Sequence, residues 1–306
     1  MKTTRTPKGP TVQQFMARFP TDDACLDHLM RIRYGTVFQC PKCEREARYY
    51  RVAKRRCYEC ERCGNQIYPT AGTPFQKTRT SLRDWFFVMY LFCASRNGVS
   101  AKEIQREIGV TYKTAWRMAH QIRKYMGYVD GDDMLGGSGK HLEIDKTFIG
   151  GHDAKGEDDK AVVLGIVKRG GDVVTRHIPD RSVWSVVPVM QQFVKPGSKV
   201  TTDQARVFRV LSEAGFEHGT INHSKGERSR GAHHTGGIEG YWSMLKRGIN
   251  GTYISVSQKH LQKYLWEFEF RHNLRHQPHL MFELLLRAFP RFDPTPWPPE
   301  ARQTAA

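Results

Sequence analysis

Apolar positions recur mainly with helical periodicity in the first part of this chain, whereas the second part also contains short strand-like apolar runs. This change of periodicity divides the chain into two parts. In the first part, apolar residues at helical spacing predict helices over 22–33, 81–97, 101–108 and 112–126. Thr21 and Ser100 are placed to cap the first and third of these, because a hydroxyl there can accept a backbone N–H. Residues 36–70 are polar and rich in cysteine, which predicts a small module with little core of its own.

The second part alternates short apolar runs with helical patterns. The runs predict strands over 141–150, 160–169, 172–180, 199–203 and 218–223. The helical patterns cover 184–194, 205–214, 238–247 and 256–275. The glycine-rich residues 131–140 read as a linker, whereas residues 1–10 and the proline-rich 290–306 read as loose ends. This order predicts a multidomain chain whose second part is an α/β domain.

The charge is concentrated in the first part. Residues 1–126 hold 24 of the 48 Lys and Arg but only 10 of the 31 Asp and Glu, which is +14 of the net +17. Such a field is typical of a module that binds a polyanion. The longest apolar run, 85–94, is ten residues and too short to span a bilayer, and the N-terminus lacks the apolar segment of a secretory signal. We therefore expect a cytoplasmic, nucleoid-associated protein.

Four cysteines have the spacing of a metal site. Cys40 and Cys43 form one CxxC pair, and Cys60 and Cys63 form another after 16 intervening residues. This pattern predicts a zinc ribbon with one structural Zn²⁺ bound by four thiolates. Cys57 also forms a CxxC pair with Cys60, but Gly64 after Cys63 favours the Cys60/Cys63 pair. Arg55 and Arg56 in the same module are candidates for contacts to DNA phosphates.

Residues 98–126 suit a helix-turn-helix. Ile104 and Ile108 lie one turn apart in the first helix, and a turn at Gly109 precedes the second. In the second helix the pattern turns one set inward and another outward. The inward set is Ala115, Met118, Ala119 and Ile122, and the candidates for DNA contact are Tyr112, Lys113, Arg117 and Gln121. An ordinary helical hairpin is the alternative interpretation.

Three acids lie in, or at an end of, elements predicted for the second part. Asp145 lies in a strand, Asp203 lies where a strand ends, and Glu239 opens a helix. Carboxylate oxygens are the ligands that Mg²⁺ or Mn²⁺ prefers, and two such ions can promote attack on a phosphodiester. Lys246 lies two helical turns after Glu239 on the same helix face and can hold a DNA phosphate. Without further evidence, such a triplet can also arise by chance.

The chain resembles the zinc-ribbon DDE transposases of bacterial insertion sequences, which are similar to eukaryotic Merlin elements. The resemblance rests on CPKC (40–43), GVSAKEIQREIGVTYKTAWRM (98–118), EIDKTFIGG (143–151), TTDQARVF (201–208) and HTGGIEGYWSMLKRGINGTY (234–253). It implies an RNase H-like catalytic domain with a mixed five-stranded sheet. It also implies Asp145, Asp203 and Glu239 as the metal-binding triad and Lys246 as an accessory residue. The chain departs from the family at Gly236, usually Asn, and at Lys146, commonly an acid.

The resemblance also implies a domain order and a set of partners. We expect an N-terminal helical segment, the zinc ribbon, the helix-turn-helix, a linker, the catalytic domain, and a C-terminal helix with a tail. Their boundaries are 1–35, 36–76, 77–128, 129–140, 141–278 and 279–306. The expected partners are terminal inverted repeats, target DNA and further copies of the chain in a dimer or higher oligomer. A DNA-binding protein without catalysis and a structure-directed nuclease remain the alternatives.

Overall fold

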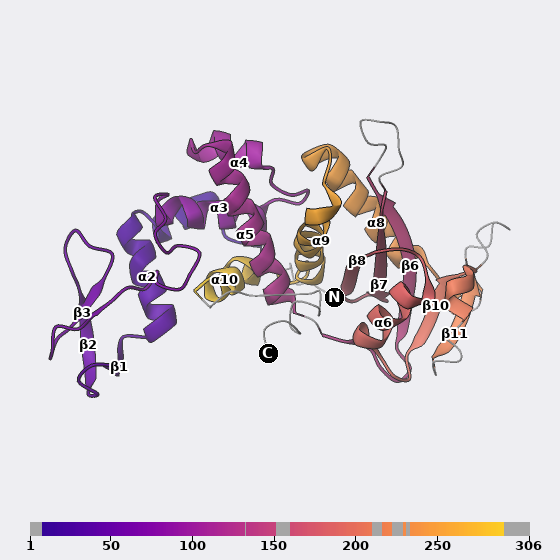
Figure 1. Ribbon diagram of the computed structural model, residues 1–306, viewed down its shortest axis with the longest axis horizontal. Helices are drawn as coiled ribbons and strands as arrows, with labels where there is room; N and C mark the ends of the chain where they lie inside the picture. Colours follow the sequence, from indigo (N-terminus) through magenta and orange to yellow (C-terminus); the bar gives the residue numbers. More distant parts are fainter. Residues whose placement is uncertain are drawn as a thin grey trace, which may run out of the picture. The chain divides into compact units, whose positions relative to one another are not determined.

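The computed structural model describes residues 8–131, 133–150, 160–209, 216–221, 229–230 and 233–290. The chain forms two compact units, one from Met1–Val129 with His276–Ala306 and the other from Asp130–Arg275 (Figure 1). Within the described ranges no helix is both long enough and apolar enough to cross a membrane.

The first unit combines a small antiparallel sheet with six helices among its described residues. Its strands, paired in the order β1-β2-β3-β4, are β1 Val37–Gln39, β2 Glu46–Arg51, β3 Tyr58–Cys60 and β4 Gln66–Ile67. Its helices are α1 Val12–Arg18, α2 Asp22–Tyr34, α3 Leu82–Ala94, α4 Ala101–Ile108, α5 Tyr112–Asp130 and α10 Pro278–Ala288.

The helix boundaries in this unit follow the capping residues. The Thr21 and Ser100 hydroxyls accept hydrogen bonds from the third residue of α2 and α4, at 3.2 and 3.1 Å, which confirms both predicted caps. Gly109 ends α4 in the left-handed conformation, with φ +67°. Helix α3 ends at Ala94, three residues before the predicted end, because the Ser95 hydroxyl binds both backbone groups of Gly98 and closes a turn.

Helix α10 comes from the far end of the sequence but belongs to the core of the first unit. The Phe282 ring lies 5.9 Å from Phe15, 6.1 Å from Phe19 and 6.2 Å from Tyr90, measured between ring centroids. Phe289, just after α10, stacks on Tyr125 at 4.2 Å. Because these rings are buried, the chain must pass through the second unit before the core of the first is complete.

The second unit is built on a mixed five-stranded sheet in the order β11-β10-β6-β7-β8, as the resemblance implied. Strands β6, β7 and β8 are antiparallel, and β10 is parallel to both β6 and β11. These strands are β6 His141–Ile149, β7 Ala161–Lys168, β8 Val173–Ile178, β10 Lys199–Asp203 and β11 Glu217–Ile221. Short strands add β5 Leu135–Gly136, β9 Val194–Lys195, β12 Ser229–Arg230 and β13 His233–His234.

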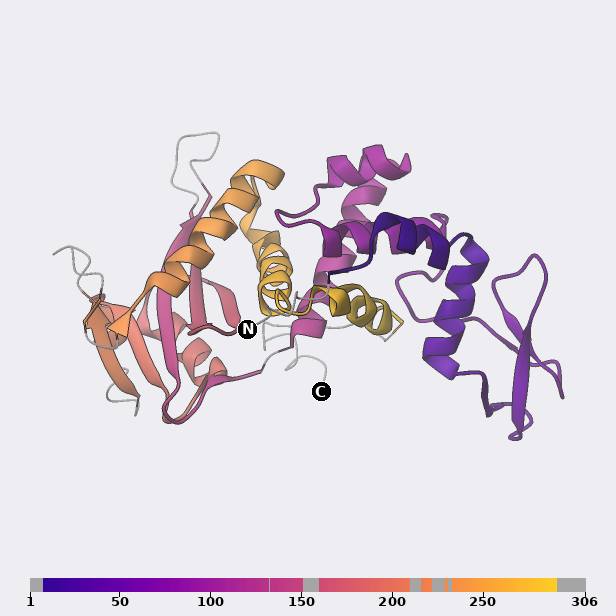
Figure 2. The same ribbon diagram turned by 180° about the vertical axis from the view of Figure 1, so that it is seen from behind.

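Helices cover both faces of this sheet. They are α6 Val183–Phe193, α8 Gly236–Gly248 and α9 Gln258–Asn273, with a 3₁₀ turn Arg206–Arg209 and a π-helical turn Ile249–Tyr253. Helix α8 lies across the face turned towards the viewer in Figure 2, and α6 lies on the other face. The α8 and α9 side chains, among them Ile238, Leu245 and Leu265, form one buried cluster with Val163 and Val167 of β7.

Two segments of the second unit differ from the prediction. Within the expected linker, Leu135 is buried and β5 pairs with β9, because Gly136 (φ +90°) lets the backbone approach Ser198. A Cβ at Gly136 would lie 2.2 Å from the Ser198 Oγ, so only glycine fits there. The helix predicted over 205–214 is seen as the 3₁₀ turn Arg206–Arg209, and 210–214 lie outside the described residues.

Candidate metal-binding and catalytic sites

The predicted zinc ligands converge. The sulfur atoms of Cys40, Cys43, Cys60 and Cys63 all lie within 4.8 Å of one another. The Sγ atoms of Cys40 and Cys63 are 3.6 Å apart, close to the roughly 3.8 Å expected for two thiolates on one tetrahedral zinc ion. Cys57 is buried apart from this group, with its Sγ 3.9 Å from Gln66 Oε1. The four-cysteine cluster therefore fits one structural Zn²⁺, and the Cys60/Cys63 pair is the one that takes part.

The acid Asp145 is half-buried at the centre of the sheet and faces α8. The indole Nε1 of Trp242 donates to its Oδ2 at 3.0 Å. Gly165 lies opposite Asp145 in β7, and a Cβ there would come within 2.5 Å of the Trp242 ring. Glycine at this position is therefore what lets the indole cross the strand and reach the carboxylate.

Asp203 ends β10, the strand next to β6. Thr201 pairs with Glu143, so the same register continued by two residues brings Asp203 beside Asp145. The Asp203 Oδ1 accepts the Ala205 N–H at 3.1 Å, which holds the side chain at the strand end. Burial raises the pKa of Asp145, and the charge on Asp203 raises it further, although nearby donors oppose the shift. A carboxylate whose charge is disfavoured by burial and by a neighbouring acid is a setting for a cation.

Glu239 lies in the first turn of α8 and is exposed. Its Oε1 accepts the Thr235 hydroxyl at 2.8 Å. Trp242, the indole that binds Asp145, follows on the same face one turn later, so Glu239 lies on the side of α8 that faces the acids. Among the described residues, the three carboxylates do not gather within 4.8 Å of one another as the four thiols do. The structure thus brings Asp145 and Asp203 together and places Glu239 on a separate element, one turn before the indole that binds Asp145.

A buried acid, Glu143, ties α8 to the sheet. It is fully buried, and its Oε2 accepts the backbone N–H groups of Gly237 at 2.8 Å and Ile238 at 3.0 Å. Its Oε1 lies 3.1 Å from His234 Nδ1 and 3.5 Å from Arg169 Nε. A carboxylate at a helix N-terminus satisfies free N–H groups and complements the helix dipole. Glu143 therefore fixes the start of the helix that carries Glu239.

Neither Glu143 nor Trp242 was among the residues predicted from the sequence to take part in the site, although Trp242 also belongs to the buried core. The sequence feature related to Glu143 is the glycine at position 237, because a Cβ there would lie 2.9 Å from Glu143 Oε2 and displace it. Nothing in the sequence pointed to the bond between Trp242 and Asp145, which depends on how α8 crosses the sheet.

Two lysines differ in their relation to the acids. Lys246 is exposed on α8. Lys146 is half-buried, and its ammonium lies 4.3 Å from the centre of the Phe208 ring. Burial lowers the pKa of Lys146, while Asp203 and Asp145 act to raise it. A cation therefore lies within electrostatic reach of both acids at the position where the resembling family commonly has an acid.

The predicted DNA-contacting residues have varied surroundings. Of the set on α5, Tyr112, Lys113 and Arg117 are exposed and Gln121 is partly buried. The inward set, Ala115, Met118, Ala119 and Ile122, is buried as predicted.

In the zinc module, Arg55 is exposed. Arg56 donates to Asp22 at 2.9 Å and to the Thr78 carbonyl at 3.4 Å, so it has a structural partner in the same unit.

Comparison with known proteins gives consistent similarities. Residues 134–273 match the ISXO2-like transposase domain, and residues 20–66 match the transposase zinc-ribbon domain. An uncharacterized protein in transposable element ISH50 of Halobacterium salinarum is 26% identical over 286 residues, covering 85% of this chain and 94% of the relative. An uncharacterized transposase-like protein of Haemophilus influenzae is 32% identical over 101 residues, covering 33% of this chain and 80% of the relative.

Proposed function

We propose, from the premise that this chain belongs to the family of ISXO2-like transposases, that it cuts DNA at the ends of a mobile element and joins them to target DNA. The observation that carries this proposal is the pairing of Asp145 and Asp203 on adjacent parallel strands, with Glu239 on a helix bound over the same face. The second unit would then be an RNase H-like catalytic domain with these acids as its triad.

The three acids suit two divalent ions, Mg²⁺ or Mn²⁺, because their ligand atoms are hard oxygens and two of them repel each other without a cation. Held by Asp145, Asp203 and Glu239, such ions would supply activation of the attacking hydroxyl and stabilisation of the leaving oxygen. The chain's own groups orient the ligands: the Trp242 indole holds Asp145, the Ala205 N–H holds Asp203, and the Thr235 hydroxyl holds Glu239. Lys246, two turns along α8, binds a phosphate of the substrate.

The first unit would recognise the terminal inverted repeats. It holds most of the positive charge, and α4 and α5 are joined by the three residues 109–111 as in a helix-turn-helix. We expect α5 to enter the major groove with Tyr112, Lys113, Arg117 and Gln121, and Arg55 to contact a phosphate. Arg56 is the weakest of these candidates because Asp22 already pairs with it. Since both ends of an element must be held together, we expect a dimer or higher oligomer on DNA.

A second candidate function is DNA binding without catalysis, as in a repressor. The observation that favours it is Lys146, whose ammonium is close enough to Asp145 and Asp203 to interact with both charges. A fixed cation there competes with metal ions for the same carboxylates. The side chain that the family usually has at Gly236 is also missing from the start of α8.

The test uses purified full-length protein and labelled DNA that carries the sequences flanking its own gene. With Mg²⁺ or Mn²⁺ we expect cleavage at the ends and joining to a target plasmid, and with EDTA neither. Asp145→Asn should abolish cleavage, by about 10³-fold or more, and leave end binding unchanged. Lys146→Glu distinguishes the two candidate functions. If the wild type binds the DNA ends without cutting them and the variant cuts them, Lys146 is what makes the wild type catalytically inactive.

A further inference from the structure

A large basic cavity opens in the first unit, and none of its lining residues belongs to the zinc-ribbon strands or to α4 and α5. It has a volume of about 910 Å³ and lies among α1, α2 and α10. Its lining residues are Arg18, His28, Arg31, Ile32, Arg33, Arg287 and Pro290. Cavities of this size are typical of ligand sites, but those are lined mainly by apolar side chains, whereas four of these seven residues are arginines.

The positive charge of this cavity is not neutralised. Arg18 forms a bidentate ion pair with Glu283, and Arg33 donates to the carbonyls of Pro69 and Ala71 at 2.7 and 2.6 Å. Arg31 and Arg287 are exposed, and among the described residues neither forms an ion pair within 4.0 Å, although Arg31 donates to the Asp27 carbonyl at 3.4 Å and Arg287 lies one turn from Glu283. Four guanidinium groups and the one carboxylate of Glu283 leave an excess of three positive charges.

The arginines converge on a common space. Burial first, and then Arg18, Arg31 and Arg287 together, lower the pKa of His28 to about 4, against the opposing effect of Glu283. His28 is therefore neutral at pH 7 and adds no charge. Three guanidinium groups from three different helices act on this one ring, so a ligand in the cavity would meet all of them.

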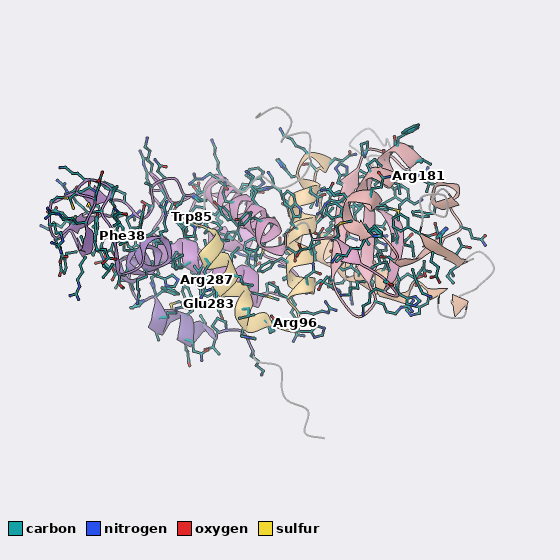
Figure 3. All side chains as sticks on the ribbon, turned by 90° about the horizontal axis from the view of Figure 1, so that it is seen from below. Phe38, Trp85, Arg96, Arg181, Glu283 and Arg287 are labelled. Atoms are coloured by element: carbon teal, nitrogen blue, oxygen red, sulfur yellow. The ribbon has the colours of Figure 1, made fainter. Side chains whose placement is uncertain are left out.

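Helix α10 completes the cavity from the far end of the sequence. Glu283 and Arg287 lie one turn apart on α10 (Figure 3). Packing of Phe282 against Phe15 and Phe19 fixes the helix against α1. The ion pair between Arg18 and Glu283 sets its rotation. The cavity is thus held in shape before any ligand binds, which lowers the entropic cost of binding.

We propose that this cavity binds phosphate groups of the DNA backbone, through residues other than the four zinc-binding cysteines and the paired helices α4 and α5. Guanidinium groups match phosphate oxygens in a bidentate way, and an excess of positive charge favours an anionic ligand. The proposal rests on the proposed function, because DNA is the polyanion that a transposase binds. A free nucleotide or inorganic phosphate has the same chemistry and is the other source of the anion.

The experiment measures binding of a labelled duplex carrying the element's end, at several salt concentrations, for wild type, Arg31→Gln, Arg287→Gln and the double variant. We expect affinity to fall roughly tenfold for each arginine. The plot of log K against log salt should also become less steep, by about 0.9 for each phosphate that the variant no longer neutralises. Arg96→Gln is the matched control, since Arg96 is an exposed arginine of the same unit that does not line the cavity.

Each outcome decides one question. Unchanged affinity and slope in the double variant, or an equal loss in Arg96→Gln, would overturn DNA binding at this cavity while leaving the proposed function intact. No binding of DNA by the wild type would overturn both. If inorganic phosphate or a mononucleotide raises the melting temperature of the wild type only, while DNA binding is equal in all variants, the ligand is a free phosphate and not DNA. Unchanged zinc content and melting temperature in buffer establish that the variants are folded.

Discussion

The zinc ribbon and the acid site both bring negatively charged ligands together, but they do so through different parts of the structure. The four thiols lie between residues 40 and 63 and are brought together by short hairpins of one small sheet. The acids lie between residues 145 and 239, on two strands and a helix. The zinc ligands therefore depend on local turns, whereas the acids depend on how α8 is seated on the sheet. Damage to one site should leave the other intact.

The largest expected effect is the loss of a zinc ligand. Cys60→Ala should reduce the bound zinc far below one ion per chain and unfold the ribbon, because structural zinc contributes about 10–16 kcal/mol in small zinc modules. End binding should be lost, while the unit Asp130–Arg275 should melt at an unchanged temperature. Zinc content and calorimetry of the purified protein provide the measurement. Cys57→Ala is the control and should keep its zinc; loss of metal there alone would reassign the ligand set.

The next largest effect tests how Glu143 anchors the start of α8 to the sheet. Glu143→Ala leaves the Gly237 and Ile238 N–H groups without their acceptor and should destabilise the second unit by about 2–4 kcal/mol in urea unfolding. Zinc content should not change. Glu217→Ala removes an acid of the same unit that is 61% exposed and paired with Lys199, so it should cost less than about 1 kcal/mol. Equal effects of the two substitutions would show that Glu143 does not anchor the helix.

A smaller effect concerns pH and the helices of the first unit. The pKa of His28 falls from 6.5 to about 4 in the folded protein, through burial and nearby arginines. A lowered pKa means that the unfolded chain takes up the proton first, so stability is present above pH 6.5 and is lost as pH falls towards 4. The loss should be on the order of 2–3 kcal/mol. His28→Leu should flatten the difference in urea midpoint between pH 7 and pH 5; equally steep curves would contradict this assignment.

The smallest effect isolates the Trp242 hydrogen bond. Trp242→Phe keeps an aromatic ring against Gly165 but removes the N–H that binds Asp145. We expect cleavage to slow about tenfold, equivalent to roughly 1.4 kcal/mol, since one hydrogen bond to a charged group is removed. End binding and zinc content should equal those of the wild type. If Trp242→Phe cleaves at the wild-type rate, the indole N–H does not contribute to cleavage and Trp242 serves only in packing.

Much of the fold could be predicted because its signals are local. Thr21 and Ser100 mark helix starts by chemistry that acts within three residues, and both caps are present. The short apolar run of β7 predicted a strand because a strand that is buried on both faces needs apolar side chains at nearly every position. The same reasoning failed for the end of α3 and for β5, where a serine turn and a glycine that admits Ser198 override the pattern.

The sequence by itself determined the ligand set of the zinc site, the five strands of the central sheet with most of the helices, and the basic character of the first unit, because spacing, periodicity and charge are properties of neighbours in the chain. Only the tertiary structure decided that Trp242 reaches Asp145, that Glu143 holds α8, and that α10 returns to close the core and the arginine-lined cavity of the first unit. Those contacts join residues about a hundred or more positions apart. They depend on how whole elements pack, which no local pattern encodes.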